Sequence, residues 1–313
     1  MKLFNDKARP FLKWAGGKRQ LIPQLSELLP NELYDNDFTY IEPFVGGGAM
    51  LFFMLNKYPK IKKVIINDIN KKLTDTYKII KDDPEGLVLM LTNLENEYNR
   101  LQADDSRKEF YLKQRERFNE AKLDLLETTA LLIFLNRTCF NGLYRENSKG
   151  KFNVPFGRYV NPTICNADVL YADSKLLNKC EIEILTGDFS NTANFVEENN
   201  LTFFYFDPPY RPLSATSSFN SFVKENFNDD SQRKLSNFCR DLALKENVLW
   251  MLSNSDCSAK NPEDTFFEDI YNGFDIQRVF ASRAVNANAS KRGKLTELLI
   301  RNYKTPIIEQ IAM

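Results

Sequence analysis

The chain has 313 residues, 43% of them hydrophobic, with a formal net charge of zero and no histidine. A chain of this length can form one large domain or a core domain that carries a sizeable insert. The lack of histidine excludes Ser-His and Cys-His catalytic pairs and histidine-ligated zinc, so any chemistry relies on carboxylates, Lys, Tyr, backbone groups or a cofactor.

The cysteines and the chain start point to a cytoplasmic protein. No two of the five cysteines have the two-residue separation of a zinc or redox pair. Residues 1–10 are polar and basic, without the apolar core of a signal peptide. No stretch approaches the ~20 uncharged apolar residues that a membrane span needs. We therefore expect no membrane partner and no metal.

Positive charge gathers in three segments, 1–20, 137–158 and 283–301. The first holds six Lys or Arg residues against Asp6 alone, and the second holds five against Glu146. Basic segments separated by neutral or acidic ones can converge into one surface that attracts DNA. Ordinary solvated charges explain the same distribution, so charge alone leaves both interpretations open.

The first motif lies in residues 40–50, after a predicted amphipathic helix at 20–29. An apolar strand end is followed by Gly46, Gly47 and Gly48 and then by a helix start. Glycines let the backbone adopt positive φ and approach a ligand closely. The spacing matches neither the dinucleotide-binding nor the phosphate-loop pattern, so a purely structural turn stays an alternative.

Asp68 ends the next predicted strand, 64–68, twenty-two residues after Gly46. An acid at this place is well positioned to accept hydrogen bonds from the ribose hydroxyls of an adenosine-containing ligand. The Gly-rich turn and Asp68 together predict a cofactor site.

Residues 76–135 have leucines at helical spacing and no strand signal, which predicts a helical insert within an α/β domain. Residues 141–159 are rich in Gly, Asn and basic residues, which predicts a hairpin or an exposed ordered loop. Because binding loops are carried on rigid scaffolds, we expect a recognition element here.

Further apolar runs at 182–186, 203–207 and 248–252 predict buried strands, and 230–245 has an amphipathic helical pattern. Strands that alternate with helices are typical of a doubly wound, largely parallel α/β sheet.

Asp207, Pro208, Pro209 and Tyr210 directly follow the aromatic run 203–207 and so emerge at the carboxyl edge of the sheet, where ligands bind in such folds. The prolines stiffen the backbone and remove two N–H donors, which leaves carbonyls and a carboxylate as acceptors. A planar primary amine such as that of adenine needs two acceptors: Asp207 and the Pro208 carbonyl suit its two hydrogens. Tyr210 suits stacking on the base, which contributes ~1–3 kcal/mol. A rigid surface turn is the structural alternative.

These segments stand in an order that resembles the Dam-type DNA adenine methyltransferases, particularly GATC-recognising methylases of restriction–modification systems. The resemblance covers about residues 10–303 and rests on the motifs at 10–18, 42–48, 67–68, 140–145, 152–159, 187–189, 207–210, 252–255 and 288–303.

The resemblance implies an α/β, doubly wound, mostly parallel seven-stranded methyltransferase sheet with an inserted helical target-recognition domain that carries a β-hairpin. The catalytic domain would comprise residues 1–75 and 158–313, and the target-recognition domain residues 76–157. The implied reaction transfers a methyl group from S-adenosylmethionine to the N6 amine of a flipped adenine in double-stranded DNA. We expect a monomer and, as a functional partner, a restriction endonuclease acting on the same site.

The family's site residues carry over position by position. Asp207, Pro208 and Tyr210 would be catalytic. The S-adenosylmethionine site would comprise Trp14, Lys18, Phe44, Gly46, Gly48, Asp68, Asp188, Phe189 and Asp207. Arg145 would read a guanine, for which a phosphate contact is the alternative. DNA would be contacted by Lys13, Asn141, Leu143, Arg145, Pro155 and Tyr159.

Two other functions fit parts of this pattern. A related pocket can serve an amine of RNA or of a glutamine side chain, although such an enzyme has no evident need for the insert at 76–159. A non-catalytic DNA-binding module is the third alternative, against which the tetrad, the Gly-rich turn and Asp68 argue together.

Overall fold

The protein is described by a computed structural model in which residues 8–14, 16–120, 122–212, 227–281 and 295–304 are placed. Residues 283–294, which belong to the third basic segment and partly to the predicted motif at 288–303, lie outside the described residues.

The strands of the protein are β1 (Phe38–Glu42), β2 (Ile61–Asp68), β3 (Glu181–Thr186), β4 (Leu201–Phe206), β5 (Val248–Ser255), β6 (Asp275–Ala281) and β7 (Leu295–Arg301). Its helices are α1 (Ile22–Glu27), α2 (Glu32–Asp35), α3 (Ala49–Lys57), α4 (Lys71–Asp82), α5 (Pro84–Arg100), α6 (Asp104–Glu120), α7 (Leu125–Thr138), α8 (Ala167–Leu177), α10 (Asp229–Ala243) and α11 (Phe266–Ile270), with short 3₁₀ turns η1 (Phe140–Gly142) and η2 (Phe189–Phe195).

The strands form one seven-stranded sheet in the order β3-β2-β1-β4-β5-β7-β6. Strands β1, β4 and β5 run parallel, which agrees with the predicted α/β fold. At the far edge β7 pairs antiparallel with both β5 and β6, so the sheet is mixed there. The predicted strands at 64–68, 182–186, 203–207 and 248–252 correspond to β2, β3, β4 and β5.

Asx residues begin most of the longer helices. The side chain at the N-cap accepts a hydrogen bond from an N–H of the first helical turn, which satisfies a donor that has no partner inside the helix. Pro84 supplies the first residue of α5, where its missing N–H costs nothing. The capping residues are Asn70, Asp83, Asp124, Asn166 and Asn228.

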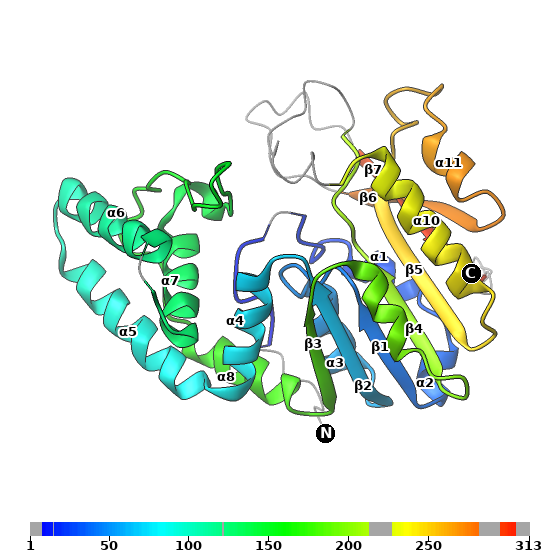
Figure 1. The fold of residues 1–313 in the computed structure, drawn as a ribbon, viewed down its shortest axis with the longest axis horizontal. Coiled ribbons are helices and arrows are strands. Elements are labelled where there is room, and N and C mark those ends of the chain that lie inside the picture. Colours follow the sequence, from blue (N-terminus) through cyan, green and yellow to red (C-terminus); the bar gives the residue numbers. More distant parts are fainter. Residues whose placement is uncertain (1–7, 15, 121, 213–226, 282–294, 305–313) are drawn as a thin grey trace, which may run out of the picture. The chain divides into compact units, whose positions relative to one another are not determined.

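The chain divides into two compact units. Unit 1 comprises residues 1–18, 45–59 and 66–189, and unit 2 comprises residues 19–44, 60–65 and 190–313. Within unit 1, α7 is buried along most of its length and packs against α4, α5 and α6 (Figure 1). This helical part of unit 1 confirms the helical pattern predicted for residues 76–135.

The loop at residues 139–159 of unit 1 differs from a regular hairpin. Instead of paired strands it has two isolated antiparallel bridges, Cys139 to Phe156 and Glu146 to Phe152. Asn119 on α6 supports it by accepting from the N–H of Phe152 and donating to the carbonyl of the same residue. The loop is therefore ordered largely by hydrogen bonds to its backbone. Among the described residues, no helix is long and apolar enough to cross a membrane.

Candidate functional site

The tetrad 207–210 begins directly after β4, whose residues from Thr202 onward are buried. Because β4 runs parallel to β1 and β5, the tetrad emerges at the edge of unit 2 where these strands end. This is the location that the sequence predicts. The apolar strand fixes the main chain up to Phe206, and the polar groups begin where the strand ends.

Asp207 is held by a buried polar cluster in unit 2. The Ser253 hydroxyl on β5 donates to Oδ1 of Asp207 at 3.1 Å and lies 3.2 Å from the Tyr205 hydroxyl. Glu42, at the end of β1, is 2% exposed and accepts from the Tyr40 hydroxyl at 2.8 Å. Burial raises the pKa of Glu42 well above its usual range, and the negative charge of Asp207 acts in the same direction. The sequence prediction gave no site role to Glu42 and Ser253, although they lie in the motifs at 42–48 and 252–255 on which the family resemblance rests.

Tyr210 is oriented by a second carboxylate. Its hydroxyl donates to Oε2 of Glu297 on β7 at 2.7 Å. Burial raises the pKa of Tyr210 well above its usual value, and the neighbouring Asp207 and Glu297 carboxylates raise it further. The hydroxyl therefore stays protonated and can keep donating, which fixes the position of the hydroxyl end of the ring. Glu297 is another residue that the sequence prediction missed.

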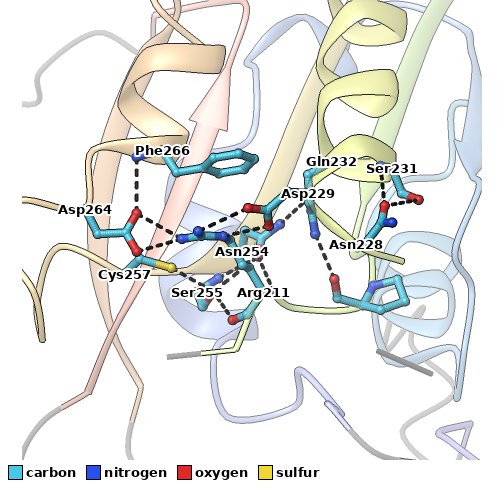
Figure 2. A network of polar contacts seen from close by, with 11 residues as sticks. Arg211, Asn228, Asp229, Ser231, Gln232, Asn254, Ser255, Cys257, Asp264 and Phe266 are labelled. Atoms are coloured by element: carbon cyan, nitrogen blue, oxygen red, sulfur yellow. Dashed lines mark hydrogen bonds and ion pairs between the residues drawn. The ribbon is translucent and has the colours of Figure 1, made fainter. Parts of the chain in front are cut away.

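The main chain of the tetrad is anchored on α10 and β5. Gln232 of α10 donates through Nε2 to the Pro209 carbonyl at 3.0 Å. The N–H of Arg211 points to Oδ1 of Asn254 at 3.4 Å, and the Ser255 hydroxyl donates to the Arg211 carbonyl at 2.7 Å. Figure 2 shows these groups together with the Arg211 side chain, which lies between Asp229 and Asp264.

The Gly-rich turn in unit 1 has the backbone that the sequence predicts. Gly46 has φ +48° and Gly48 has φ +76°, a region that favours glycine. A side chain at Gly46 would also meet the Trp14 indole at 3.1 Å, and one at Gly48 would meet the Tyr77 hydroxyl at 2.4 Å. Glycine is therefore needed here for close packing within the chain as well as for the turn itself.

Asp68 closes this turn. Its Oδ2 accepts from the N–H of Gly46 at 3.1 Å, and its Oδ1 accepts from the N–H of Asn70 at 2.9 Å. Burial raises the pKa of Asp68, while these backbone donors lower it. A carboxylate has about four lone-pair sites, so two backbone bonds leave acceptor capacity for the hydroxyls of a ligand.

Asp188, Phe189, Lys18 and Phe44 are further residues that the sequence predicts for the cofactor site. The N–H of Gly187 donates to the Asp68 carbonyl at 3.1 Å, which places Asp188 and Phe189 next to the end of β2 in unit 1. Asp188 is exposed and Phe189 is buried. Lys18 of unit 1 is 5% exposed, and Phe44 of unit 2 makes an edge contact with Phe227 at 5.6 Å between ring centroids.

Trp14 has a different set of neighbours from those expected of a cofactor residue alone. Its ring stacks on Tyr144 with 5.2 Å between centroids, and it also covers Gly46 and Gly47. The Tyr144 hydroxyl donates to Glu146, which pairs with Lys72 of α4 at 2.7 Å. Trp14 thus links the Gly-rich turn to the 139–159 loop within unit 1.

The residues predicted to contact DNA lie on the 139–159 loop and on the segment before Trp14. Lys13, Asn141, Leu143, Arg145 and Pro155 are exposed and Tyr159 is half-buried. Asn141 has φ +55°, in the left-handed region that asparagine adopts more readily than most residues other than glycine.

Two of these side chains are held in place within unit 1. The Arg145 guanidinium donates through Nε to the Asn153 side chain at 2.7 Å and through an Nη to the Asn153 carbonyl at 3.2 Å. The Lys13 ammonium lies 5.4 Å from the centre of the Tyr159 ring. Asn153 therefore orients the Arg145 guanidinium, while the Arg145 side chain as a whole stays exposed.

Asn136 brings these two segments together. It is 1% exposed, accepts from the N–H of Lys13 at 2.9 Å and donates to the carbonyls of Lys13 and Gly142, each at 2.9 Å. All its hydrogen-bonding groups thus serve the backbone of Lys13 and of η1. The sequence prediction missed Asn136, because a single polar residue near the end of a buried helix carries no motif.

A family model and several sequence relatives point to one family. Residues 14–285 match the model of the D12 class N6 adenine-specific DNA methyltransferases. The Type II methyltransferase M.MjaIII of Methanocaldococcus jannaschii is 48% identical over 95% of this chain and 100% of its own length. The Type II methyltransferase M1.LlaDCHI of Lactococcus lactis subsp. cremoris is 40% identical, covering 94% of this chain and 95% of the relative. The DNA adenine methylase of Haemophilus influenzae is 33% identical, covering 94% and 93%. The chain belongs to the D12 class N6 adenine-specific DNA methyltransferases.

Proposed function

We propose that this D12-class enzyme transfers the methyl group of S-adenosylmethionine to the N6 amine of an adenine that is flipped out of duplex DNA, within the sequence GATC. The proposal rests on which hydrogen-bond acceptors of the tetrad already receive a hydrogen bond from the protein. Ser253 holds the Asp207 carboxylate from one side. Among the described residues no hydrogen bond reaches the Pro208 carbonyl, whereas the next carbonyl, that of Pro209, is occupied by Gln232.

The amine of adenine requires such acceptors. Its lone pair is delocalised into the ring, so it is a weak nucleophile until its two hydrogens are held and the lone pair is turned toward the methyl donor. In the proposed complex the Asp207 carboxylate and the Pro208 carbonyl accept one hydrogen each. S-adenosylmethionine would supply an already activated methyl group and leave as S-adenosylhomocysteine, and the amine would lose one of its two hydrogens as a proton. The chain therefore mainly provides orientation and electrostatics. The oriented amine then requires neither histidine nor a covalent enzyme intermediate.

Tyr210 would hold the base by its face. Stacking of a base on an aromatic ring contributes about 1–3 kcal/mol. This offsets part of the few kcal/mol needed to unstack and unpair the adenine. The Glu297 hydrogen bond supports this role because it holds the hydroxyl end of the ring and involves no atom of the ring face.

We propose the S-adenosylmethionine site from the Gly-rich turn and its neighbours. Asp68, at the end of β2, would accept from the ribose hydroxyls, a role that its remaining lone pairs permit. Gly46 and Gly48 would form the backbone of the turn beside the cofactor. The remaining proposed contributors are Trp14, Lys18, Phe44, Asp188, Phe189 and Asp207.

The 139–159 loop is the proposed DNA-reading element. All but its last two residues belong to a proposed target-recognition region of residues 76–157, which is set in a catalytic domain of 1–75 and 158–313. Arg145 would donate its fork to O6 and N7 of a guanine, since Asn153 already orients the guanidinium. Exposed Asn141 and Leu143 would press against the base stack, and Pro155 would meet a thymine methyl group. Lys13 and Tyr159 would add contacts near the target base.

The two Type II relatives support a role in restriction–modification for this chain as well. We propose a restriction endonuclease acting on the same site as functional partner, and a monomer as the active form. A complex with the mass of one protein chain and one duplex would agree with this, and a two-to-one protein-to-duplex mass would contradict it.

Sequencing of modified bases in DNA from cells that express this chain tests the whole proposal. We expect N6-methyladenine at GATC and an unmodified genome in cells that express the Asp207→Ala variant. Methylation at a different sequence would overturn the proposed specificity alone. Methyl groups found only in RNA or protein would overturn the proposed substrate.

A further inference from the structure

We propose that Gln232 and Asn254 form a positioning clasp that fixes the tetrad main chain and so aims the Pro208 carbonyl at the amine. This inference rests on the proposed catalytic role of the tetrad. It concerns two side chains from different elements of unit 2, α10 and β5. Both are completely buried, at 0% exposure.

The tetrad main chain has few groups by which it can be held. Pro208 and Pro209 lack N–H donors, so the two central residues can be anchored only through their carbonyls. The structure uses the second of these: Gln232 donates to the Pro209 carbonyl at 3.0 Å. The Pro208 carbonyl, in the described part of the chain, receives no such bond. The clasp therefore holds one carbonyl, while its neighbour, on buried Pro208, accepts no hydrogen bond from the described residues.

The direction of every hydrogen bond in the clasp follows from backbone donors. The N–H groups of Ser255 and Arg211 both point to one side-chain atom of Asn254, at 2.8 and 3.4 Å, so this atom must be the oxygen. The Asn254 amide nitrogen then faces Gln232 and donates to its Oε1 at 3.1 Å. Consequently the Gln232 nitrogen faces Pro209 and donates. The main-chain N–H groups of Ser255 and Arg211 thus determine which end of Gln232 meets the tetrad.

Arg211 anchors the residue that follows the tetrad to the same two elements. Its carbonyl accepts from Ser255 on β5 at 2.7 Å, and its guanidinium pairs with Asp229, in the first turn of α10, at 2.8 Å. Asp264 binds the other side of the guanidinium at 2.7 Å, and the Phe266 ring lies 4.4 Å from it (Figure 2). Tyr210 therefore lies between two fixed main-chain positions, 209 and 211.

A merely structural role for Gln232 makes a different prediction from a positioning role. Buried polar groups are hydrogen-bonded in most proteins, and a glutamine that only satisfies a carbonyl would affect stability alone. A positioning residue affects the rate of methyl transfer while leaving substrate affinity unchanged. The two roles separate in the turnover number, the KM for DNA and the dependence of both on pH.

The Gln232→Glu variant provides this separation with little change of shape. An ionised carboxylate can only accept, so it cannot donate to the Pro209 carbonyl, whereas the protonated form can. The charged groups around the clasp, Arg211, Asp229 and Asp264, are paired with one another and are unchanged by the substitution. We expect kcat at alkaline pH to fall roughly tenfold, the loss of about one buried hydrogen bond, and to recover relative to wild type as the pH is lowered. The KM for a GATC duplex should stay within about twofold.

Gln24→Glu is the matched control. Gln24 also donates to a backbone carbonyl, that of Phe280 at 2.8 Å, but lies on α1, and its side-chain hydrogen bonds among the described residues go to Phe280 and not to the tetrad. Its kcat should equal the wild-type value at each pH. If Gln232→Glu does not fold, Gln232→Met, which has similar length but no donor, should show reduced kcat with the wild-type pH profile.

The outcomes distinguish this inference from the proposed function. A constant ratio of the Gln232→Glu and wild-type kcat across pH, or an effect on stability alone, would overturn the clasp while Asp207→Ala remained inactive. Wild-type protein that transfers no methyl group to duplex DNA, or an Asp207→Ala variant with wild-type activity, would overturn the proposed function and the clasp with it.

Discussion

The tetrad and the 139–159 loop are supported in different ways. In the tetrad, buried side chains bind the reactive groups themselves: Ser253 binds the Asp207 carboxylate and Glu297 binds the Tyr210 hydroxyl. Beside the loop, the side chain of buried Asn136 on α7 binds only backbone, and the candidate DNA contacts other than half-buried Tyr159 remain exposed. This difference fits the two tasks, because methyl transfer depends on fixed positions of a few atoms, whereas reading DNA requires side chains that reach outward from a fixed backbone. Substitutions in the first region should therefore lower kcat, and those in the second should raise KM or relax specificity.

The largest effect is expected for Asp207→Ala. Loss of the carboxylate removes an acceptor for the amine, and we expect kcat to fall by at least about a hundredfold with measurable cofactor binding retained. Single-turnover methyl transfer and calorimetry with S-adenosylhomocysteine measure the two quantities. Asp241→Ala, an exposed position on α10, should behave as wild type. Equal losses in both variants would contradict a specific role for Asp207.

The next effect is expected for Arg145→Ala. Removal of the guanidinium fork should cost about 1–3 kcal/mol of discrimination at one guanine and leave kcat nearly unchanged. Competition between GATC duplexes and duplexes with that guanine replaced measures the discrimination. If Arg145 contacts only phosphate, affinity will fall equally for both duplexes and the salt dependence of binding will weaken.

A smaller effect is expected for Asn136→Asp. A carboxylate oxygen in place of the amide nitrogen leaves the carbonyls of Lys13 and Gly142 without their donor, at a cost of about 1–3 kcal/mol in unfolding free energy. The KM for DNA should rise because Lys13 and η1 lose their common support. Denaturant unfolding together with steady-state kinetics checks both effects. A fall in kcat at an unchanged KM would break the distinction between the two regions.

The smallest effect on catalysis is expected for Asp173→Asn, which tests stability in unit 1. Asp173 of α8 is 0% exposed and accepts from the N–H of Arg9 at 2.9 Å. Burial raises its pKa from 3.8 to about 8. The folded protein therefore keeps a proton that the unfolded chain releases near pH 4, so the free energy of unfolding should fall as the pH rises from about 4 to about 8.

Asp173→Asn carries no such proton and should lose this part of the pH dependence. Its advantage over wild type should grow by at most about 1.4 kcal/mol per pH unit across that range, with unchanged methyl transfer. Asp82→Asn, an exposed position, is the control. Parallel stability curves for wild type and Asp173→Asn would show that Asp173 is ionised in the fold.

The sequence predicted the elements whose signals are local. Apolar runs located β2, β3, β4 and β5, and the order of strand and tetrad placed Asp207 at the end of β4. Glycines in a strand-to-helix turn predicted the positive φ of Gly46 and Gly48. The antiparallel pairing of β7 was missed, because a short apolar run does not encode the direction of its partner.

The missed support residues share a physical reason. Gln232, Asn254 and Asn136 act on backbone carbonyls or N–H groups, which every residue carries, so the sequence does not mark their partners. Trp14 was assigned by resemblance to the cofactor site, but its stacking on Tyr144 depends on tertiary contacts between segments 130 residues apart. Motifs therefore located the reactive groups, and only the structure showed what holds them.

The most direct test of the account measures methyl transfer from labelled S-adenosylmethionine to a synthetic GATC duplex, with the product base identified by mass spectrometry. The account predicts N6-methyladenine as the product with wild-type protein and none with Asp207→Ala. A labelled cytosine, or a labelled adenine formed equally by Asp207→Ala, would contradict the role proposed for the Asp207–Tyr210 tetrad.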